Sequence, residues 1–272
     1  MIRAAAAIAA LLGAVAAPAS PPGAPATAQA ARVVLESGSH GDLAIVENLL
    51  DGPIEVMLHG DGDATGSDPP LPARATLPAR SRALVAVLPA RTPHPRGLRL
   101  RLVAVPGDAN ARPRDVEYGW PLDSDELRIG QAWGGGFSHR DDENRHAIDL
   151  GVPVGTTVRA ARDGVVMQVE SRFSGGGLDA SHDLARANFV RVLHEDGTMA
   201  LYAHLAPGGV RVRQGERVVR GQAIAFSGDT GYSGAPHLHF AVHANRGMRL
   251  QSIPFRMWGP HGILRFAAPD FP

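Results

Sequence analysis

The stretch Gly-Ala-Pro-His-Leu-His-Phe-Ala-Val, residues 234–242, decides how this sequence folds. Residues 238–242 are mostly aromatic or aliphatic and follow a proline, which is typical of a β-strand. Side chains alternate between the two faces of a strand, so His237 and His239 are expected on the same face. Two imidazoles side by side on a rigid strand can bind a metal ion, or a metal ion together with a general base. Two surface histidines would give the same short pattern, so the rest of the chain must decide.

Length and composition narrow the classes of protein to consider. The chain has 272 residues, enough for one large domain or two modest ones. Its formal net charge is zero, and neither a basic stripe nor a block of like charge indicates a nucleic-acid partner. The absence of cysteine excludes disulfides, thiolate metal sites and cysteine nucleophiles. Any metal ion would therefore be held by histidines and carboxylates, as zinc commonly is in catalytic sites.

The N-terminal residues predict export. Arg3 is followed by an apolar run at residues 4–17, which is too short to span a bilayer. Small-residue cleavage sites follow, including Ala-Gln-Ala at residues 28–30. Residues 1–30 are thus expected to be a signal peptide and flexible segment, which would place the protein in a periplasm or outside the cell. No later apolar run is long enough for a membrane helix.

Residues 31–118 are expected to form a small β-sandwich-like domain. Short apolar runs at residues 54–58, 83–88 and 98–105 are broken by proline, glycine and aspartate. Regularly spaced short strands with turn residues between them are typical of a sandwich. The polar stretch at residues 107–114 is interpreted as a linker.

Residues 119–272 are expected to form a second domain, and the chain as a whole is predicted to be mainly β. Nine of the twelve histidines lie after residue 119. Residues 155–166 predict two strands around an Arg-Asp-Gly turn, and residues 189–202 predict a hairpin. Long helical patterns are hard to find, so this region is interpreted as an antiparallel β domain.

Three further residues are candidates to join the histidine pair. His139 is followed ten residues later by Asp149, and His204 lies at the end of the predicted hairpin. A catalytic zinc ion usually takes three protein ligands and keeps one position open for water. These residues supply the histidine and carboxylate groups that such a site needs.

The sequence from Ile129 to Asn245 resembles the lysostaphin/LytM-type zinc endopeptidases, which cut the peptide part of bacterial peptidoglycan. The resemblance implies the antiparallel β catalytic fold of that family, the duplicated hybrid motif. It rests on several linked motifs in a fixed order: Phe-Ser-His at 137–139, Ala-Ile-Asp at 147–149, Pro-Val-Gly-Thr-Thr-Val-Arg-Ala-Ala-Arg-Asp-Gly-Val-Val at 153–166, Tyr-Ala-His-Leu at 202–205, and Gly-Ala-Pro-His-Leu-His-Phe at 234–240.

The resemblance implies a set of zinc ligands. In the family a histidine, an aspartate and the second histidine of the His-x-His motif bind zinc, which implies Asp149 and His239 here. Many members place the first histidine four residues before the aspartate, where this chain has Arg145, which cannot bind zinc. Others insert extra residues and carry that histidine in a Ser-His context, which His139 fits. His146 is the rival, and it is interpreted as a strand residue beside the site.

The resemblance also implies two catalytic histidines, His204 and His237. Zinc lowers the pKa of bound water from about 15.7 toward 7 and polarises the scissile carbonyl. A neutral imidazole beside the water can take its proton, and an imidazole can donate a hydrogen bond to the oxyanion or protonate the leaving amine. Which of His204 and His237 is the base stays open at this point.

The remaining polar residues have more ordinary interpretations. His243 is expected on the face of the histidine pair, but about 13 Å beyond it, as a surface or groove residue. His194 is interpreted as structural. Residues 171–186, with Asp179 and His182, form either a loop or a wall of the substrate groove.

Three residues, Asn188, Tyr202 and Tyr232, match family positions that line the cleft. Each is expected either to orient substrate through hydrogen bonds or to pack against its neighbours.

Taken together, the resemblance implies a secreted zinc-dependent endopeptidase that hydrolyses peptide cross-links of peptidoglycan through a metal-activated water. The alternative is a non-catalytic module that binds peptidoglycan or activates another wall hydrolase. Family members of that kind lack some of the metal or catalytic residues, and none is missing here. The bond cleaved, a Gly-Gly bridge or a D-Ala cross-link, stays open, and so does the oligomeric state. The predicted N-terminal organisation looks most like the Gram-negative cross-link group, which is an analogy of architecture rather than of site chemistry.

Overall fold

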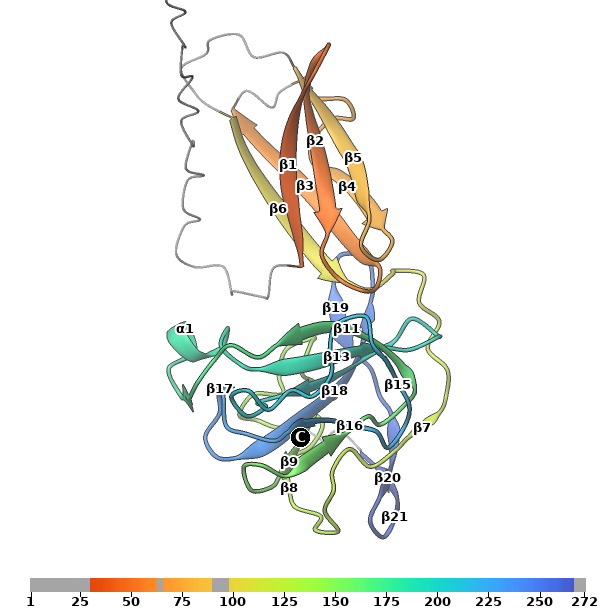
Figure 1. The fold of residues 1–272 in the computed structure, drawn as a ribbon, viewed down its shortest axis with the longest axis vertical. Coiled ribbons are helices and arrows are strands. Elements are labelled where there is room, and N and C mark those ends of the chain that lie inside the picture. The colour runs from red at the N-terminus through yellow and green to blue at the C-terminus, as the bar shows by residue number, and fades with distance from the viewer. Residues whose placement is uncertain (1–29, 63–65, 90–97, 267–272) are drawn as a thin grey trace, which may run out of the picture.

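The computed structural model describes residues 30–62, 66–89 and 98–266. The signal peptide expected at residues 1–30 lies almost entirely outside them. No helix within the described ranges is long and apolar enough to cross a membrane. Figure 1 shows two β-rich parts stacked along the long axis, with the chain passing from the upper part to the lower.

The N-terminal part consists of two three-stranded antiparallel sheets. One has the order β1 (Ala31–Gly38), β2 (Gly41–Asn48) and β5 (Arg82–Pro89). The other has the order β4 (Ala73–Leu77), β3 (Ile54–Gly62) and β6 (Leu98–Pro106). The runs predicted as strands fall within β3, β5 and β6. Buried side chains from both sheets, among them Val46, Val56 and Leu88, share one apolar core.

The C-terminal part is built on one larger sheet. Its strands are, in spatial order, β15 (Arg217–Val218), β11 (Gly164–Glu170), β13 (Phe189–Leu193), β14 (Met199–Ala203), β18 (His237–Asn245), β9 (Ile148–Gly151) and β8 (Ile129–Gln131), with β19 (Leu250–Ser252) also on β18.

Short strands complete this part. They are β10 (Thr157–Arg159) with β16 (Ala223–Phe226), β12 (Gly176–Gly177) with β17 (Gly231–Tyr232), and β7 (Glu117–Tyr118) with β20 (Arg256–Gly259) and β21 (Gly262–Arg265). Within the described ranges the helix α1 (Ala180–Asp183) has only four residues, so the mainly β fold class is confirmed.

The pairing confirms part of the predicted secondary structure. The predicted strand at residues 238–242 is the middle of β18, and the predicted hairpin is β13 paired with β14. Residues 155–166 do contain two strands, β10 and β11. These two strands do not pair with each other, because β10 pairs with β16 whereas β11 pairs with β13 and β15.

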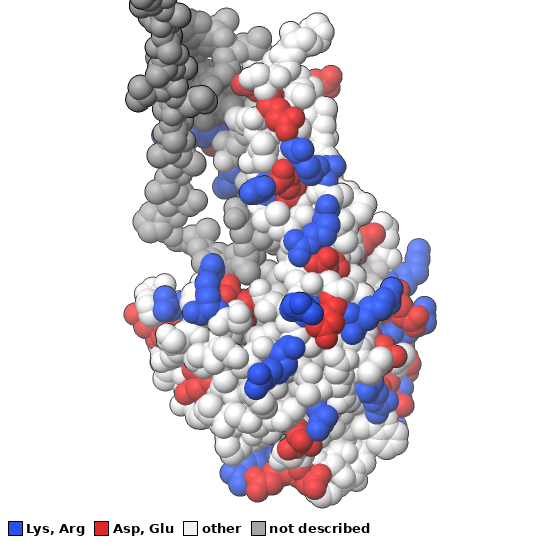
Figure 2. All heavy atoms as spheres, viewed as in Figure 1, with Lys and Arg blue, Asp and Glu red and all other residues white. Residues whose placement is uncertain are grey.

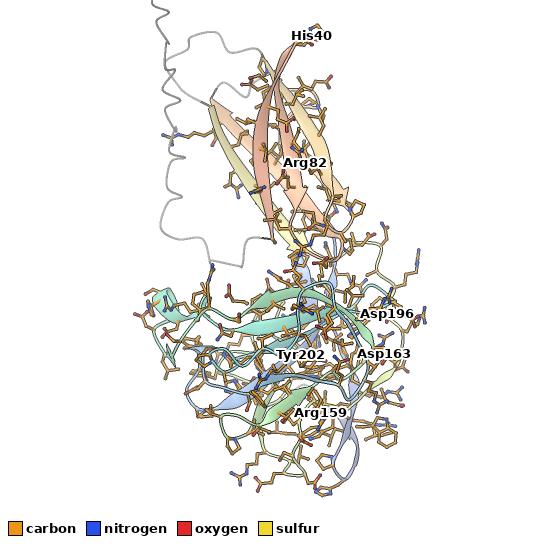
Figure 3. All side chains as sticks on the ribbon, viewed as in Figure 1. His40, Arg82, Arg159, Asp163, Asp196 and Tyr202 are labelled. Carbon is orange, nitrogen blue, oxygen red and sulfur yellow. The ribbon has the colours of Figure 1, made fainter. Side chains whose placement is uncertain are left out.

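The interior of the C-terminal part is an aromatic cluster beneath the larger sheet. The ring centroid of Phe240 lies 5.2 Å from that of Tyr202, 5.3 Å from that of Phe255 and 6.1 Å from that of Tyr118, all edge-on. Tyr202 lies in the middle of the C-terminal part (Figure 3), is fully buried, and its hydroxyl accepts a hydrogen bond from Ala161 N at 2.7 Å. The packing alternative therefore holds for Tyr202, which does not line a cleft.

Strand β7 lies at the predicted boundary between the domains. It pairs in parallel with β20, and Tyr118 is buried in the core of the C-terminal part. The division into residues 31–118 and 119–272 stays a prediction, but Glu117 and Tyr118 lie with the C-terminal part.

The two parts share apolar side chains. Met167 and Met199 of the larger sheet are fully buried in the core formed by the N-terminal sheets. Asp51 N donates to Met167 O at 3.0 Å, and the side chain of Gln214 donates to Leu49 O at 2.8 Å. A shared core together with these hydrogen bonds fixes how the N-terminal part is attached.

The segment predicted as a linker, residues 107–114, has no regular secondary structure but is anchored. Gly107 N donates to Pro53 O at 2.8 Å, and Gly107 O accepts from the Asn245 side chain at 3.0 Å. Gly107 has a φ of 91°, and a Cβ there would lie 2.7 Å from a carbon of Met199. Glycine is required at this position by both its backbone conformation and the close approach.

His194 is a buried residue near one end of the larger sheet, as expected for a structural histidine. Its Nδ1 donates to the backbone oxygen of Asp163 at 2.8 Å. Burial lowers the pKa of His194 to about 4, because charging the ring would require removing the charge from water. Asp163 and Asp196, which both act electrostatically on this ring, lie on one side of the C-terminal part (Figure 3).

The depressed pKa of His194 predicts a pH-dependent stability. As pH falls below 6.5, His194 in the unfolded chain binds a proton, whereas His194 in the folded chain binds one only when pH reaches about 4. The contribution of neutral His194 to the free energy of unfolding is therefore complete above pH 6.5. It is lost as pH falls from 6.5 toward 4, by up to about 1.4 kcal/mol per pH unit. Urea unfolding at pH 7, 6 and 5 should show this decrease, with a smaller slope for His194→Gln. Equal slopes for both proteins would contradict the assignment.

Candidate metal centre

Three neighbouring strands bring the central residues of the site together. In the register of the sheet, His239 on β18 lies opposite Ala203 of β14 on one side and Asp149 of β9 on the other. The nearest ring nitrogens of His239 and His237 lie 2.9 Å and 3.7 Å from Asp149 Oδ1. Both histidines thus point to the same face of β18, which confirms the prediction from strand alternation.

His139 reaches the same carboxylate from the loop between β8 and β9. Its Nε2 lies 3.2 Å from Asp149 Oδ1, and its side chain is fully buried. Its Nδ1 lies 2.9 Å from Ala132 O, and because a carbonyl only accepts, Nδ1 must carry the proton. Nε2 faces the Asp149 carboxylate, and once it gives up the proton that it shares with that carboxylate it is the nitrogen available to a metal ion.

The donor set formed by His139, Asp149 and His239 fits zinc. One donor atom from each lies within 4.8 Å of the other two. Tetrahedral zinc with nitrogen and oxygen ligands at about 2.0–2.1 Å places neighbouring ligand atoms about 3.3 Å apart. The 3.2 Å and 2.9 Å separations around Asp149 Oδ1 are close to that spacing. Two imidazoles and one carboxylate, mostly buried, match the ligand types of catalytic zinc sites.

The electrostatics of the site are centred on Asp149. Burial by itself would raise the pKa of this carboxyl, but hydrogen bonds from His139 and His239 and their charges outweigh it and hold the pKa well below its usual range. For His139, burial acts to lower the pKa, yet the hydrogen bond and charge of Asp149 raise it overall. The carboxylate is therefore ionised at any physiological pH and can neutralise part of a cation's charge.

Gln131 is the residue of this site that the sequence did not reveal. Its Nε2 donates to Asp149 Oδ2 at 2.8 Å, and its Oε1 accepts from the backbone nitrogens of Phe137 at 3.1 Å and Ser138 at 3.3 Å. It thereby orients the carboxylate and fixes the start of the loop that carries His139. A single glutamine has no motif, and only the pairing of Gln131 with Asp149 across β8 and β9 identifies it.

His204 and His237 face each other beside this group, with ring centroids 4.5 Å apart. His204 Nδ1 donates to Thr230 O at 2.7 Å, and His237 Nδ1 donates to Ala235 O at 2.7 Å. In each ring Nδ1 carries a proton, so Nε2 is the nitrogen left to contact a reactant. This arrangement suits proton transfer to and from a reactant held at Asp149 and His239.

His204 has two unusual properties. Its φ of 60° is in the left-handed region, which costs a residue with a side chain about 1–3 kcal/mol and is concentrated at functional sites. The next residue is held by Leu205 N donating to Asn188 O at 3.1 Å. Burial, followed by the neighbouring His237 and His239, lowers the pKa of His204 to about 3, so its ring is neutral at neutral pH.

Two other histidines lie outside the group. His146 Nδ1 donates to Ser252 O at 2.9 Å, and its ring packs edge-on against Trp133. It precedes β9 in a turn, so its interpretation as a strand residue is wrong. His243 is 1% exposed, which contradicts the expected surface or groove position. It is buried because Arg191 and the Glu143 backbone pack around it, and burial and Arg191 lower its pKa to about 3.

The segment 171–186 is ordered around β12 and α1. Asp179 caps α1 by accepting from Ser181 N at 2.9 Å, and the His182 side chain is exposed. The side chain of Asn188 holds the backbone of Phe173 in place. Asn188 Oδ1 accepts from Phe173 N, and Asn188 Nδ2 donates to Phe173 O. Asn188 is fully buried, so it holds backbone in place instead of facing a cleft.

An aromatic pair lies close in sequence to the site residues. The rings of Phe137 and Tyr232 stack with centroids 5.5 Å apart and planes at 12°, and Phe137 is 57% exposed. Phe137 is two residues from His139, and Tyr232 is two residues from Thr230, which holds His204. The exposed ring of Phe137 therefore offers a flat apolar surface, and the two stacked rings belong to the chain segments that carry His139 and hold His204.

Comparisons with known proteins relate part of this chain to peptidases. The family model of Peptidase family M23 matches residues 143–251, a range that begins after His139. The glycyl-glycine endopeptidase ALE-1 of Staphylococcus capitis is 39% identical over 103 residues, which are 38% of this chain and 25% of that protein. The peptidoglycan DD-endopeptidase ShyA of Vibrio cholerae is 35% identical over 97 residues, 36% of this chain and 20% of that protein. The chain thus matches a quarter or less of the length of these relatives.

Among solved structures, the catalytic domain of a mutant of the prophage-encoded M23 protein EnpA from Enterococcus faecalis is similar to this chain. The sequence identity is 23%, and the match covers 52% of this chain and 94% of that chain with a TM-score of 0.38.

Replacing Gln131 with alanine should weaken metal binding without unfolding the protein. Asp149 would lose the hydrogen bond that orients its second oxygen, and loss of such a partner typically lowers metal affinity 10–100-fold. Competition with a zinc chelator measures the affinity. Gln222→Ala, whose side chain bonds Glu216 away from the site, is the matched control and should keep the wild-type affinity. Equal affinities for all three proteins would exclude the orienting role of Gln131.

Proposed function

Because residues 143–251 match the family model of Peptidase family M23, we propose that the chain is a zinc-dependent endopeptidase that hydrolyses the peptide cross-links of bacterial peptidoglycan. The observation that carries the proposal is the grouping of four histidines around the Asp149 carboxylate. Asp149 together with His139 and His239 has the composition and spacing of a zinc site. His204 and His237 lie beside this group, each with Nδ1 bonded to a backbone carbonyl and Nε2 left for a reactant.

In this proposal His139 Nε2, Asp149 Oδ1 and His239 Nδ1 hold the metal. The hydrogen bond from His139 Nδ1 to Ala132 O fixes the ring of His139, and Gln131 fixes Asp149. A ligand set held by such outer partners loses little entropy on binding, which favours both affinity and correct geometry.

When bound, zinc supplies a Lewis acid that polarises a peptide carbonyl and acidifies water. The residues of the chain supply the proton transfers. His204 and His237 each donate from Nδ1 to a backbone carbonyl, so Nε2 is the nitrogen through which either ring can exchange a proton with a reactant. We assign to this pair the removal of a proton from the attacking water, the stabilisation of the oxyanion and the return of a proton to the leaving amine.

The substrate follows from the names of the relatives and from the shape of the site. ALE-1 is named a glycyl-glycine endopeptidase and ShyA a peptidoglycan DD-endopeptidase, so both names describe cleavage within a peptide and the second names peptidoglycan as the substrate. The exposed stack of Phe137 and Tyr232 would give an extended peptide a flat wall to lie against. Such a substrate lies outside the cytoplasmic membrane, which agrees with the export expected from residues 1–30.

Purified protein with zinc should release peptide fragments from purified peptidoglycan. Removal of the metal with a chelator should abolish release, and added zinc should restore it. Asp149→Ala should reduce the rate at least a hundredfold, because the carboxylate shared by both ligand histidines is lost. Asp123→Ala, which alters an exposed ion pair with Arg159, is the matched control and should keep the rate. Mass spectrometry of the fragments assigns the bond cut, and the proposal fails if no wall type yields fragments.

The two site histidines of β18, His237 and His239, should respond differently to mutation. His239→Ala should lose stoichiometric zinc, measured by metal analysis after gel filtration. His237→Ala should keep most of the zinc and lose turnover by at least a hundredfold, since its role is proton transfer or oxyanion binding. His182→Ala, an exposed histidine, should change neither. Loss of zinc in both β18 variants, or in neither, would contradict this division of roles.

A further inference from the structure

The backbone around His204 is held by two residues that are not among the five site residues, Asn188 and Thr230. His204 has a φ of 60°, and a conformation of this kind persists only where the surrounding contacts enforce it. The contacts are made to the next residue, Leu205. Leu205 N donates to Asn188 O at 3.1 Å, and Leu205 O accepts from Thr230 Oγ1 at 2.8 Å. Both backbone polar groups of the residue that follows His204 are therefore fixed.

Thr230 connects these contacts through its hydroxyl group. Its Oγ1 donates to Leu205 O and accepts from Asn188 N at 3.0 Å. Thr230 and Asn188 are almost completely buried, so these hydrogen bonds are shielded from water. Without the hydroxyl, Asn188 N would lose its partner and Leu205 O would keep only a contact to Asn188 Nδ2 at 3.4 Å. A buried backbone group left unpaired is costly, so the backbone would have to shift.

The peptide bond between Thr230 and Gly231 contacts His204 directly. Its carbonyl oxygen accepts from His204 Nδ1 at 2.7 Å, and its N–H donates to Gly175 O at 3.2 Å. Because N–H and C=O of a trans peptide point in opposite directions, this one planar group connects the imidazole to Gly175. Hydrogen bonds in such a chain polarise and strengthen one another. The orientation of the His204 ring thus depends on how Gly175 and its neighbours hold this peptide.

Residues 175–177 are three glycines, here called the glycine strap. In the parallel pairing of β12 with β17, Gly176 lies opposite Gly231. A Cβ on Gly176 would overlap the backbone oxygen of Asp229, and Gly231 has a φ of 82°. Glycine at both positions lets two backbones meet where a side chain would not fit. The glycine strap therefore holds the loop at residues 229–233 in place by backbone contact.

His237 provides an internal comparison. Its Nδ1 donates to Ala235 O at 2.7 Å, which is a carbonyl only two residues away in the same stretch of chain. This hydrogen bond involves neither Thr230 nor Asn188. A change that acts through Thr230 should therefore alter the hydrogen bond of His204 and leave that of His237 in place.

Surface charge gives no competing explanation on the visible side of the molecule. Basic and acidic side chains are interspersed over the face shown in Figure 2, so that face carries no field of one sign that could orient a buried group. The charges that act on His204 belong to the site residues His237, His239 and Asp149. The contact of its Nδ1 with Thr230 O is a local hydrogen bond.

We propose that Thr230 is a positioning residue for His204, and that Asn188 and the glycine strap hold Thr230 where this role requires it. Thr230 acts through its backbone oxygen, which keeps a proton on His204 Nδ1 and leaves Nε2 to contact a reactant. The effect on turnover rests on the proposed function, whereas the hydrogen bond of His204 can be measured without it.

The test compares Thr230→Val, Thr230→Ser and Gly176→Ala with the wild-type full chain loaded with zinc. Valine keeps the shape of threonine and lacks the hydroxyl, whereas serine keeps the hydroxyl. NMR of isotope-labelled histidine rings detects the solvent-protected Nδ1 proton, and the signal that is missing in His204→Gln belongs to His204. This signal should be lost in Thr230→Val and in Gly176→Ala and kept in Thr230→Ser. The His237 signal should persist in all three variants.

Turnover should separate positioning from a general loss of structure. In Thr230→Val, kcat should fall at least about tenfold with KM changed less than about twofold, since a positioned acid–base group contributes about 10²–10⁴-fold. Zinc affinity, measured against a chelator, should stay at the wild-type value because the ligand residues keep their contacts. Thr156→Val removes a hydroxyl bond to Pro153 O at 2.9 Å in the turn before β10, and this matched control should keep kcat.

Four results would overturn the proposal. They are an unchanged His204 signal in Thr230→Val, an unchanged His204 signal in Gly176→Ala, an equal loss of kcat in Thr230→Ser, and a zinc affinity that falls in parallel with kcat. Gly176→Ala displaces the glycine strap and leaves the Thr230 side chain intact, so it decides the question if Thr230→Val does not fold. If the protein hydrolyses no cell-wall peptide, the proposed function fails and the NMR comparison still decides the role of Thr230.

Discussion

The hydrogen bonds that meet at the Asp149 carboxylate are the interaction on which the site depends. One oxygen faces nitrogens of His139, His237 and His239, and the other accepts from Gln131. A buried carboxylate is costly unless such partners compensate it. Each partner is in turn fixed by an element of the sheet or by a backbone carbonyl. The geometry of the centre is thus a property of the β-sheet that presents it.

The features predicted correctly from the sequence depend on local rules. Strand alternation predicted that His237 and His239 share a face, and apolar runs with turn residues predicted β13, β14 and β18. His139 was preferred to His146 because its Ser-His context matched the motif, and the structure brings His139 to Asp149 whereas His146 is bonded to Ser252.

The features that could not be predicted from the sequence depend on which residues pack against a strand. Gln131 matters only because β8 pairs with β9 in one register, and no single-residue signal reports a register. The burial of His243 depends on Arg191 and on the loop over it, which are distant in sequence. Tyr202 matched a cleft position, but its ring lies on the inner face of β14. The strands β10 and β11 were recognised, yet their partners are set by long-range pairing.

Strand β18 is hydrogen-bonded to β14 on one side and to β9 and β19 on the other, over nearly its whole length. Backbone amides in such a position exchange with solvent only when the sheet itself opens. Strand β18, the floor of the metal centre, therefore keeps its structure for as long as the protein stays folded. The floor cannot adjust to a ligand on the timescale of binding. Any adaptation must come from the connecting segments at residues 132–147 and 171–186, where the chain has few long strands. The centre therefore rests on a rigid strand, and discrimination between ligands is concentrated in the segments that surround that strand.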